Sequence, residues 1–287
     1  MRLFCFGYGF SARALAALLP DAEIVATARS AEAAGELKSL GVEAVPFDGT
    51  APLPAGALDG VTHLLASVPP GDEGDPVVRH CGEQLRAAGA IRWVGYLSTT
   101  GVYGDHQGGW VDETTPLTPA GRRGERRVTA ERQWLELFAD RPEVSVQLFR
   151  LAGIYGPGRS QFRAVREGTA RRLVKPGQVF SRIHVDDIAQ VLKASIERPR
   201  DGAAYNLCDD EPAPPQDVVA FAAELLGIDP PPEVAFEDAD LSPMARSFYG
   251  ESKRVSNTLI KEELGIRLRF PNYRDGLRAV AKAEGLL

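Results

Sequence analysis

Apolar positions in the first 155 residues alternate between short continuous runs and longer segments with helical spacing. The short runs predict six strands, at residues 2–6, 23–28, 42–47, 61–68, 91–98 and 144–152. The helical spacing predicts helices between them, at residues 11–19, 30–40, 75–89 and 124–139. Because parallel neighbours need a crossover connection, this alternation predicts an α/β fold with a parallel sheet covered by helices on both faces.

The pattern becomes less regular after about residue 155, where several segments are rich in turn residues. Helices are predicted at 186–197, 215–226 and 273–284, and the prolines at 230–232 predict a stiff extended spacer. We expect this part to form a small C-terminal lobe over the carboxyl edge of the sheet. Ligands bind at that edge in open α/β sheets.

Composition narrows the class of protein. The chain has 287 residues, of which 44% are hydrophobic and 25% charged, as in ordinary soluble proteins. Its net charge of -6 argues against a nucleic-acid surface, and no apolar run is long enough to span a membrane. Cys5, Cys81 and Cys208 lack metal-ligand spacing, so we expect buried small side chains, no metal site and a cytoplasmic location.

One glycine turn carries the strongest chemical signal. Gly7, Gly9 and Ala12 form a Gly-x-Gly-x-x-Ala pattern after the first predicted strand and at the start of the first predicted helix. Gly7 suits a tight turn, Gly9 leaves room for a pyrophosphate, and Ala12 lets the helix pack closely. The backbone amides near Phe10 and Ser11 would then face a dinucleotide diphosphate. The alternative is a glycine-rich turn without a ligand.

The end of the second strand indicates which dinucleotide is bound. Arg29 lies twenty residues after Gly9, where an NAD site would have an acidic residue. A guanidinium there can hold a 2′-phosphate, so the sequence predicts NADP in preference to NAD, which remains possible. The alternative for Arg29 is a surface pair with Glu32. Asp48 is placed either to accept from the adenine amino group or to cap a turn before Gly49.

Five further segments resemble landmarks of the extended short-chain dehydrogenase/reductases, the NAD-dependent epimerase/dehydratase family. They are residues 98–104, 149–160, 181–189, 205–212 and 252–257. The resemblance covers nearly the whole chain and looks like an atypical branch of the family. It implies a Rossmann-type doubly wound parallel sheet with a small C-terminal α+β substrate lobe. The implied dinucleotide-binding domain covers 1–158, completed by about 183–207, and the lobe covers 159–182 and 208–287.

The resemblance also implies a chemistry. In the family a Tyr-x-x-x-Lys pair moves a proton while the nicotinamide exchanges a hydride with the substrate. A hydroxyl that binds the reacting oxygen carries over to Thr99, with Thr100 as its neighbour. The further cofactor contacts that we expect are at Ser30, Ser67, Leu151 and Ile154.

The chain departs from the family where this pair is expected. The alignment puts Arg123 at the tyrosine position and Arg127 at the lysine position. Arg127 can still donate to ribose hydroxyls, but neither guanidinium can act as an acid or a base. The alternative is a solvated helix face with ion pairs Arg127–Glu131 and Arg132–Glu136.

Other groups are candidates for moving the proton. Tyr103 and Tyr155 match family positions that are mostly structural, and His106 lies in a predicted loop over the pocket with a suitable ordinary pKa. A solvated loop histidine is the alternative for His106. We expect His184 to make a hydrogen bond within the fold.

Basic residues after residue 149 are candidates for an anionic substrate. These are Arg150, Arg159, Arg163 and Lys175, with scattered surface cations as the alternative. The main hypothesis is an NADP-dependent oxidoreductase or epimerase that acts on a small carbonyl, hydroxyl or sugar-type compound, as a monomer or homodimer. The second hypothesis is a non-catalytic NADP(H)-binding redox sensor.

Overall fold

The computed structural model describes residues 1–287, apart from the side chain of Met244. The chain divides into two compact units. Unit 1 comprises Met1–Val102, Gly121–Arg150 and Ile188–Tyr205, and unit 2 comprises Tyr103–Ala120, Leu151–Asp187 and Asn206–Leu287. The domain bounds given above remain a prediction.

Unit 1 is built on a seven-stranded sheet with the order β11-β7-β5-β4-β1-β2-β3. Its strands are β1 (Arg2–Phe6), β2 (Glu23–Ala28), β3 (Glu43–Pro46), β4 (His63–Ala66), β5 (Trp93–Thr99), β7 (Ser145–Leu151) and β11 (Ala204–Leu207). From β3 to β5 each neighbouring pair is parallel. The order reverses beside β1, as in Rossmann-type folds, and such a reversal forms a crevice at the carboxyl ends of the strands.

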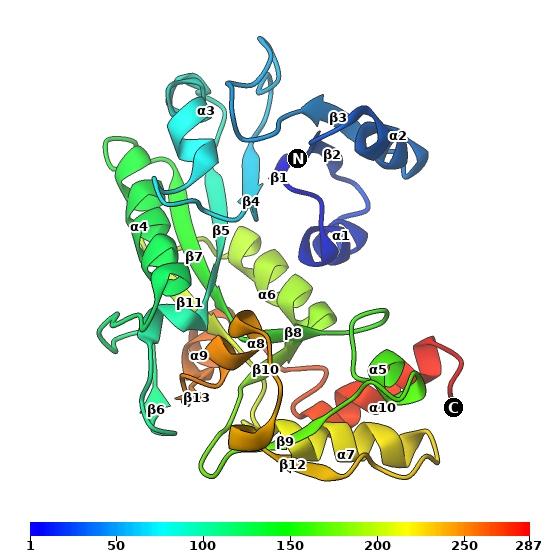
Figure 1. Ribbon diagram of the computed structural model, residues 1–287. Coiled ribbons are helices and arrows are strands. Elements are labelled where there is room, and N and C mark those ends of the chain that lie inside the picture. The colour runs from blue at the N-terminus through cyan, green and yellow to red at the C-terminus, as the bar shows by residue number, and fades with distance from the viewer. The chain divides into compact units, whose positions relative to one another are not determined.

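The helices of unit 1 cover this sheet (Figure 1). They are α1 (Phe10–Ala17), α2 (Ala31–Ser39), α3 (Pro76–Ala87), α4 (Arg122–Leu137) and α6 (Val185–Glu197). Phe4, Phe6, Tyr96 and Trp134 are buried in one continuous apolar core with side chains of α3 and α4. Burying large aromatic rings of this kind contributes strongly to folding.

Asp75 shows how a polar residue joins these two helices. Its carboxylate caps α3 by accepting from the backbone amides of Val77 and Val78, at 2.8 and 3.4 Å. It also accepts from the Trp134 indole of α4 at 3.1 Å. A buried carboxylate needs such partners, so this contact fixes how α4 lies beside α3.

Unit 2 is a smaller α+β assembly (Figure 1). Its strands are β6 (Trp110–Val111), β8 (Gly153–Tyr155), β9 (Arg172–Val174), β10 (Arg182–His184), β12 (Glu233–Ala235) and β13 (Arg254–Val255). Its helices are α5 (Phe162–Arg166), α7 (Pro215–Leu225), α8 (Pro243–Phe248), α9 (Thr258–Leu264) and α10 (Tyr273–Ala283), with a short 3₁₀ turn η2 (Phe236–Asp238). A second 3₁₀ turn, η1 (Thr100–Tyr103), follows β5 at the end of the first segment of unit 1. Its strands pair two by two, β8 with β10, β9 with β12 and β6 with β13.

The core of unit 2 lies between α5, α7 and α10. Tyr155, Phe162, Phe221, Tyr273 and Val280 are buried there together. Gly276 lets α10 approach β8, because a Cβ at this position would lie 2.0 Å from the Tyr155 hydroxyl oxygen. This close approach places the Tyr155 ring against α10.

The three cysteines agree with the expectation drawn from their spacing. Cys5, Cys81 and Cys208 are free and buried, as predicted. Within the described residues, no helix is long and apolar enough to cross a membrane. No group of histidine, cysteine and acidic side chains that could hold a metal ion occurs in the part of the chain that the structure describes.

Candidate functional site

The glycine turn of unit 1 has the conformation that its sequence predicts. Gly7 has φ +87°, a left-handed conformation that suits glycine. A Cβ there would lie 2.7 Å from the Ser67 Oγ, which itself donates to the carbonyl oxygens of Phe6 and Gly7. The Gly7 amide donates to the Thr27 hydroxyl at 2.9 Å. Hydroxyls from β2 and from the end of β4 therefore fix the turn that precedes α1.

The helix start beyond this turn is open. Gly9 is the N-cap residue of α1 and makes no capping hydrogen bond through a side chain. A Cβ at Gly9 would meet no heavy atom within 4 Å in the described structure. Ser11 and Ala12 are buried against the sheet, while Phe10 is half-buried. Uncapped amides at a helix start attract anions, so these residues fit a diphosphate.

Arg29 and Ser30 lie just after β2 and are exposed. The Ser30 hydroxyl accepts from the Ala33 amide at 3.2 Å and so caps α2. No ion pair joins Arg29 to Glu32 among the described residues, which leaves the guanidinium available to a phosphate.

Asp48 takes the turn-capping role, one of the two roles considered for it. Its Oδ1 accepts from the Thr50 amide at 2.9 Å and from the Thr50 hydroxyl at 2.7 Å. These hydrogen bonds hold the pKa of Asp48 below its usual range. An adenine contact at Asp48 remains a prediction.

Thr99 and Thr100 lie where β5 ends and η1 begins, and both are half-buried. The Thr99 Oγ1 accepts from the Gly101 amide at 3.2 Å. Its own proton remains free to be donated, so Thr99 can hydrogen-bond a substrate oxygen at the carboxyl edge of the sheet.

Arg127 is half-buried and is not a member of a solvated helix face. Its Nη1 donates to the Leu97 carbonyl oxygen at 2.6 Å and to the Tyr96 hydroxyl at 3.2 Å. Its guanidinium carbon lies 5.7 Å from the centre of the Tyr96 ring. The expected Arg127–Glu131 ion pair is wrong, because Glu131 is buried and bound elsewhere, whereas Arg132–Glu136 is confirmed at 3.7 Å.

Glu131 belongs to a buried ion pair behind β5. Its carboxylate accepts from Arg150 Nη2 at 2.8 Å and from the Ser98 hydroxyl at 2.5 Å. Arg150 is 5% exposed, so the expectation that it lines a substrate cleft is wrong. A guanidinium this deep is stabilised only by such a partner, and the pair serves the packing of α4 on the sheet.

The other candidates for moving a proton lie in unit 2. Tyr103 is buried, and its hydroxyl donates to the Asn206 side-chain oxygen at 2.8 Å, which favours a structural role. His106 is half-buried, with Nε2 at 3.1 Å from the Tyr103 carbonyl oxygen. That distance indicates that Nε2 carries the proton, so Nδ1 is the nitrogen that can accept one.

His184 has the structural role that was expected. Its Nδ1 accepts from the Asp186 amide at 3.1 Å, and its ring packs 4.2 Å from that of Phe270 and 5.2 Å from that of Tyr155. Burial lowers its pKa to about 4, so it is neutral at physiological pH. Burial also raises the pKa of Tyr155 well above its usual range, so neither ring suits proton transfer.

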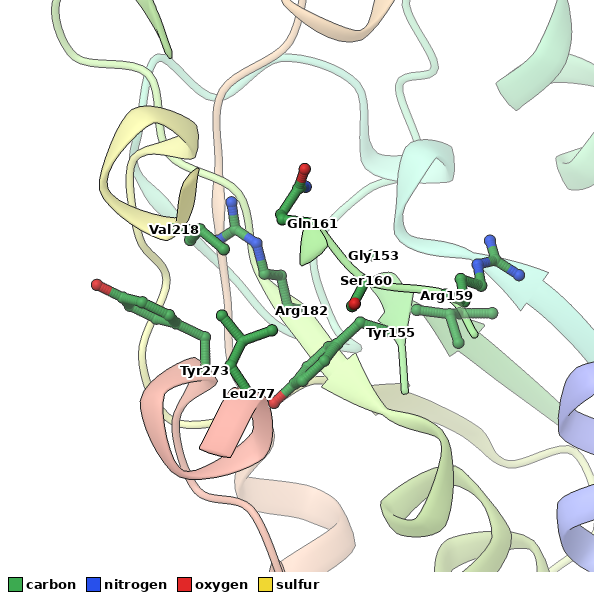
Figure 2. Close-up of a pocket in the computed structure, with 10 residues that line it drawn as sticks. Gly153, Tyr155, Arg159, Ser160, Gln161, Arg182, Val218, Tyr273 and Leu277 are labelled. Atoms are coloured by element: carbon green, nitrogen blue, oxygen red, sulfur yellow. The ribbon is translucent and has the colours of Figure 1, made fainter. Parts of the chain in front are cut away.

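Unit 2 also contains a cavity of about 280 Å³ beside β8 and β10. Its lining residues are Gly153, Ile154, Tyr155, Arg159, Ser160, Gln161, Arg182, Val218, Tyr273 and Leu277 (Figure 2). Ile154, expected as a cofactor contact, therefore lies on this cavity, while Leu151 is buried at the end of β7. Arg182 also lines the cavity, although no spacing in the sequence marks it as a site residue.

The remaining basic candidates of this region differ in their surroundings. Arg159 lines the cavity and is exposed. Arg163 pairs with Glu167 at 2.9 Å on the surface, and Lys175 donates to the Tyr249 carbonyl oxygen. Of the four residues considered, Arg159 is the one that the structure places on a cavity.

One solved structure is similar to this chain over nearly its whole length. A conserved protein of unknown function from Silicibacter pomeroyi is 56% identical to this chain, covers 99% of each chain and superposes with a TM-score of 0.90. The chain belongs to the same family as that protein. No family model matches the sequence.

Two curated proteins match part of the chain. Protein YeeZ of Escherichia coli K12 is 34% identical over 181 residues, which are 62% of this chain and 58% of YeeZ. The alignment thus spans little more than half of that relative. A 3-diazoavenalumate denitrifying reductase from a Streptomyces species is 29% identical over 216 residues, covering 69% of this chain and 67% of the reductase.

A more distant solved structure shares the fold. The dTDP-glucose 4,6-dehydratase DesIV of Streptomyces venezuelae, solved with NAD bound, is 18% identical and covers 99% of this chain and 98% of its own, with a TM-score of 0.77. At this identity the likeness establishes the Rossmann-type α/β fold, which is the fold that the sequence predicts.

Proposed function

We propose that the chain binds a nicotinamide dinucleotide on unit 1, with NADP preferred to NAD, and acts as an oxidoreductase or epimerase-like enzyme on a small carbonyl, hydroxyl or sugar-type compound. The observation that carries this proposal is the open start of α1 after the Gly7 turn. An uncapped helix start beside the reversal point of a parallel sheet is suited to a diphosphate. The NAD bound to DesIV and the reductase activity named for the Streptomyces relative are consistent with it.

The preference for NADP depends on Arg29. It is exposed just beyond β2 and has no ion-pair partner among the described residues. The α2 helix begins next to it, so amides and a guanidinium converge where a 2′-phosphate would lie. Glu32 in the first turn of α2 opposes this attraction, which makes the contribution of Arg29 decisive.

When bound, the nicotinamide supplies or accepts the hydride. On the protein side, the Thr99 hydroxyl would donate a hydrogen bond to the reacting oxygen. The fixed end of β5 would orient the Thr99 side chain. Arg127 would keep the edge of the sheet rigid through Leu97 and would offer its remaining N–H groups to ribose hydroxyls. Neither group releases a proton to the reaction, so the proton would come from water or from another residue.

A second candidate function is supported by Arg127 itself. The position aligned with the family's lysine holds a guanidinium that is already bound to a backbone carbonyl. A site that binds the nucleotide but lacks an acid on α4 suits a redox sensor whose contacts depend on the bound nucleotide. Turnover decides between the two functions.

The test is NADPH oxidation followed by absorbance with a panel of aldehydes, ketones and sugar-type carbonyls. The enzyme proposal expects turnover with at least one compound, which Thr99→Val reduces at least about a hundredfold while leaving NADPH affinity unchanged. Thr169→Val, an exposed threonine of unit 2, is the matched control. NADPH binding without any turnover would favour the sensor.

A further inference from the structure

The cavity of unit 2 is compact and lies wholly within that unit. Its volume of about 280 Å³ is at the lower end of the range for ligand pockets. Figure 2 shows Tyr155 of β8 and Arg182 of β10 on neighbouring strands, with Tyr273 and Leu277 on α10. Such a volume suits a compact molecule with one recognition group rather than a nucleoside diphosphate sugar.

Arg182 is anchored on one side only. Its Nη1 donates to the carbonyl oxygens of Phe180 and Ala213, at 2.8 and 3.0 Å. The other edge of the guanidinium, formed by Nε and Nη2, has no hydrogen-bond partner among the described residues. Neither nitrogen is among the buried polar atoms that lack a partner, so both keep some exposed surface. The two carbonyls thus fix a planar donor pair in one orientation.

The same edge binds a carboxylate elsewhere in this chain. Arg150 donates from Nε and Nη2 to the two oxygens of Glu131, while Arg126 directs the same two nitrogens to one oxygen of Asp72, at 2.7 and 2.5 Å. The two parallel N–H groups match the two oxygens of a carboxylate. Arg182 offers the same pair without a carboxylate from the protein.

The charge of Arg182 is not neutralised by an ion pair. No carboxylate lies within 4.0 Å of it among the described residues. Asp209 is the acidic group with the largest electrostatic effect on Arg182, and burial raises the pKa of Asp209 to about 8, which keeps it largely protonated at neutral pH. The other groups that act on Arg182 are the phenols of Tyr155, Tyr249 and Tyr273, which are uncharged at neutral pH. A half-buried guanidinium without a counter-charge attracts an anion.

Apart from Arg182 and the polar residues Arg159, Ser160 and Gln161, the cavity is lined by apolar and aromatic side chains. Ile154, Val218 and Leu277 line it together with the rings of Tyr155 and Tyr273. The Tyr273 hydroxyl has no hydrogen-bond partner among the described residues. These side chains suit a flat or branched hydrocarbon body attached to the anionic group.

We propose that this cavity binds a small organic carboxylate, held in two-point contact by the Nε–Nη2 edge of Arg182 with its apolar body against Tyr155, Val218 and Leu277. The site goes beyond the dinucleotide proposed for unit 1. Its test needs no nucleotide, so either proposal can fail without the other.

The test is calorimetric titration of the whole chain, without nucleotide, with benzoate and with benzamide as its uncharged counterpart. Benzoate is expected to bind at least about tenfold more tightly than benzamide, since hydrogen bonds to charged groups are stronger than those to neutral ones. Absence of benzoate binding, or equal binding of the two compounds, would overturn the proposal.

Three variants test whether Arg182 binds the carboxylate of benzoate. Arg182→Gln is expected to weaken benzoate at least about tenfold, and Arg182→Lys nearly as much, because an ammonium keeps the charge but loses the planar pair. Arg163→Gln, on the surface of the same unit, is expected to bind as the unchanged protein does. Far-ultraviolet circular dichroism shows whether Arg182→Gln is folded, and Arg182→Lys carries the test if it is not. Full affinity in Arg182→Lys would contradict the two-point contact.

Inorganic phosphate distinguishes the class of anion. The proposal expects phosphate to bind more weakly than benzoate and to be displaced by it. The opposite result would be that phosphate binds more tightly than benzoate and binds equally well to Arg182→Lys. That result would assign the cavity to phosphate esters and would overturn the carboxylate assignment.

Discussion

Arg127 of α4 donates from Nη1 to the carbonyl oxygen of Leu97 in β5, at 2.6 Å. This bond joins α4 to the strand that ends at Thr99. Arg127 is therefore part of the packing of the sheet edge, in addition to any contact with a ribose.

Arg127→Ala should lower the free energy of unfolding by about 1–3 kcal/mol, because the Leu97 carbonyl loses a charged donor and Tyr96 loses a stacked neighbour. Arg132→Ala is the control on the same helix, since its ion pair with Glu136 is exposed and worth little. Urea denaturation measures both. Equal, small effects would show that Arg127 belongs to a solvated face after all.

Glu131→Gln should destabilise the protein much more, by about 3–5 kcal/mol, because it leaves the buried charge of Arg150 without its partner. The same denaturation experiment applies, with Glu136→Gln as the exposed control on α4. A loss below 1 kcal/mol would mean that Arg150 finds another partner or water, and would contradict the ion pair described here.

The two glycines of the turn should respond differently to alanine. Gly7→Ala should destabilise the fold by about 1–3 kcal/mol or more, because φ is +87° and the new Cβ would meet the Ser67 Oγ. Gly9→Ala should leave the unfolding free energy nearly unchanged, since its φ of -87° suits any residue and the space is open. Thermal denaturation compares them. A large loss of stability in Gly9→Ala would contradict the open helix start.

Arg29→Ala should weaken NADPH at least about tenfold and leave NADH unchanged, because only the former carries the phosphate that the guanidinium is proposed to hold. Competitive binding assays with both nucleotides measure the ratio. Arg13→Ala is the control, since Arg13 is exposed on α1 and donates to the Tyr8 carbonyl oxygen. Equal losses for the two nucleotides would remove Arg29 from the 2′-phosphate site.

Most elements of unit 1 could be predicted from the sequence because each one is marked locally, whereas the edge strand β11 at Ala204–Leu207 was not predicted. The run at 3–6 is apolar throughout, as a strand buried on both faces requires, and β1 has the predicted bounds 2–6. The 75–89 segment begins with an Asp-Pro start and forms α3 as Pro76–Ala87. Local capping and periodicity sufficed here.

Unit 2 was harder because its strands are too short for a pattern. β8 and β10 have three residues each, and β6 has two, so neither alternation nor an apolar run can mark them. Their pairing depends on contacts between distant segments, such as Arg182 beside Gly153. The loop-like turns at 156–161 gave no sign that they border a cavity.

The glycine turn could likewise be predicted, whereas the partners of charged side chains could not. The spacing of Gly7, Gly9 and Ala12 predicts the local conformation at the start of α1. The role of Arg150 depends on Glu131, nineteen residues away on another element, and nothing in the sequence indicates that pairing. Arg182 was missed for the same reason, because its anchoring carbonyls come from two separate segments.

The stability of the protein should depend on pH through Asp209. Burial raises its pKa to about 8 in the folded chain, so folding retains a proton that the unfolded chain releases above its ordinary value of 3.8. The stability associated with this proton is present below about pH 4 and is lost as pH rises towards 8. The free energy of unfolding falls by up to about 1.4 kcal/mol for each pH unit. Asp209→Asn should therefore be increasingly more stable than the unchanged protein as pH rises from 5 to 8.

Comparing Asp209→Asn with the unchanged protein isolates the effect of Asp209 from that of His184. His184 changes stability with pH in the opposite direction. Its folded pKa of about 4 means that stability is lost as pH falls from about 6.5 towards 4 in both proteins. Arg182, Asp210 and Glu211 surround Asp209 and are unchanged in the variant. Unfolding curves at several pH values give the difference, and a difference that is constant with pH would contradict a protonated Asp209.

The most direct test of the dinucleotide site is calorimetric titration of NADPH into the unchanged protein and into Gly9→Ala. The account predicts saturable binding to the unchanged protein and a loss of at least about tenfold in Gly9→Ala, since its methyl group would occupy the space of the diphosphate while the fold remains intact. Absence of heat with both NADPH and NADH, or equal affinity in the two proteins, would contradict a dinucleotide at the start of α1.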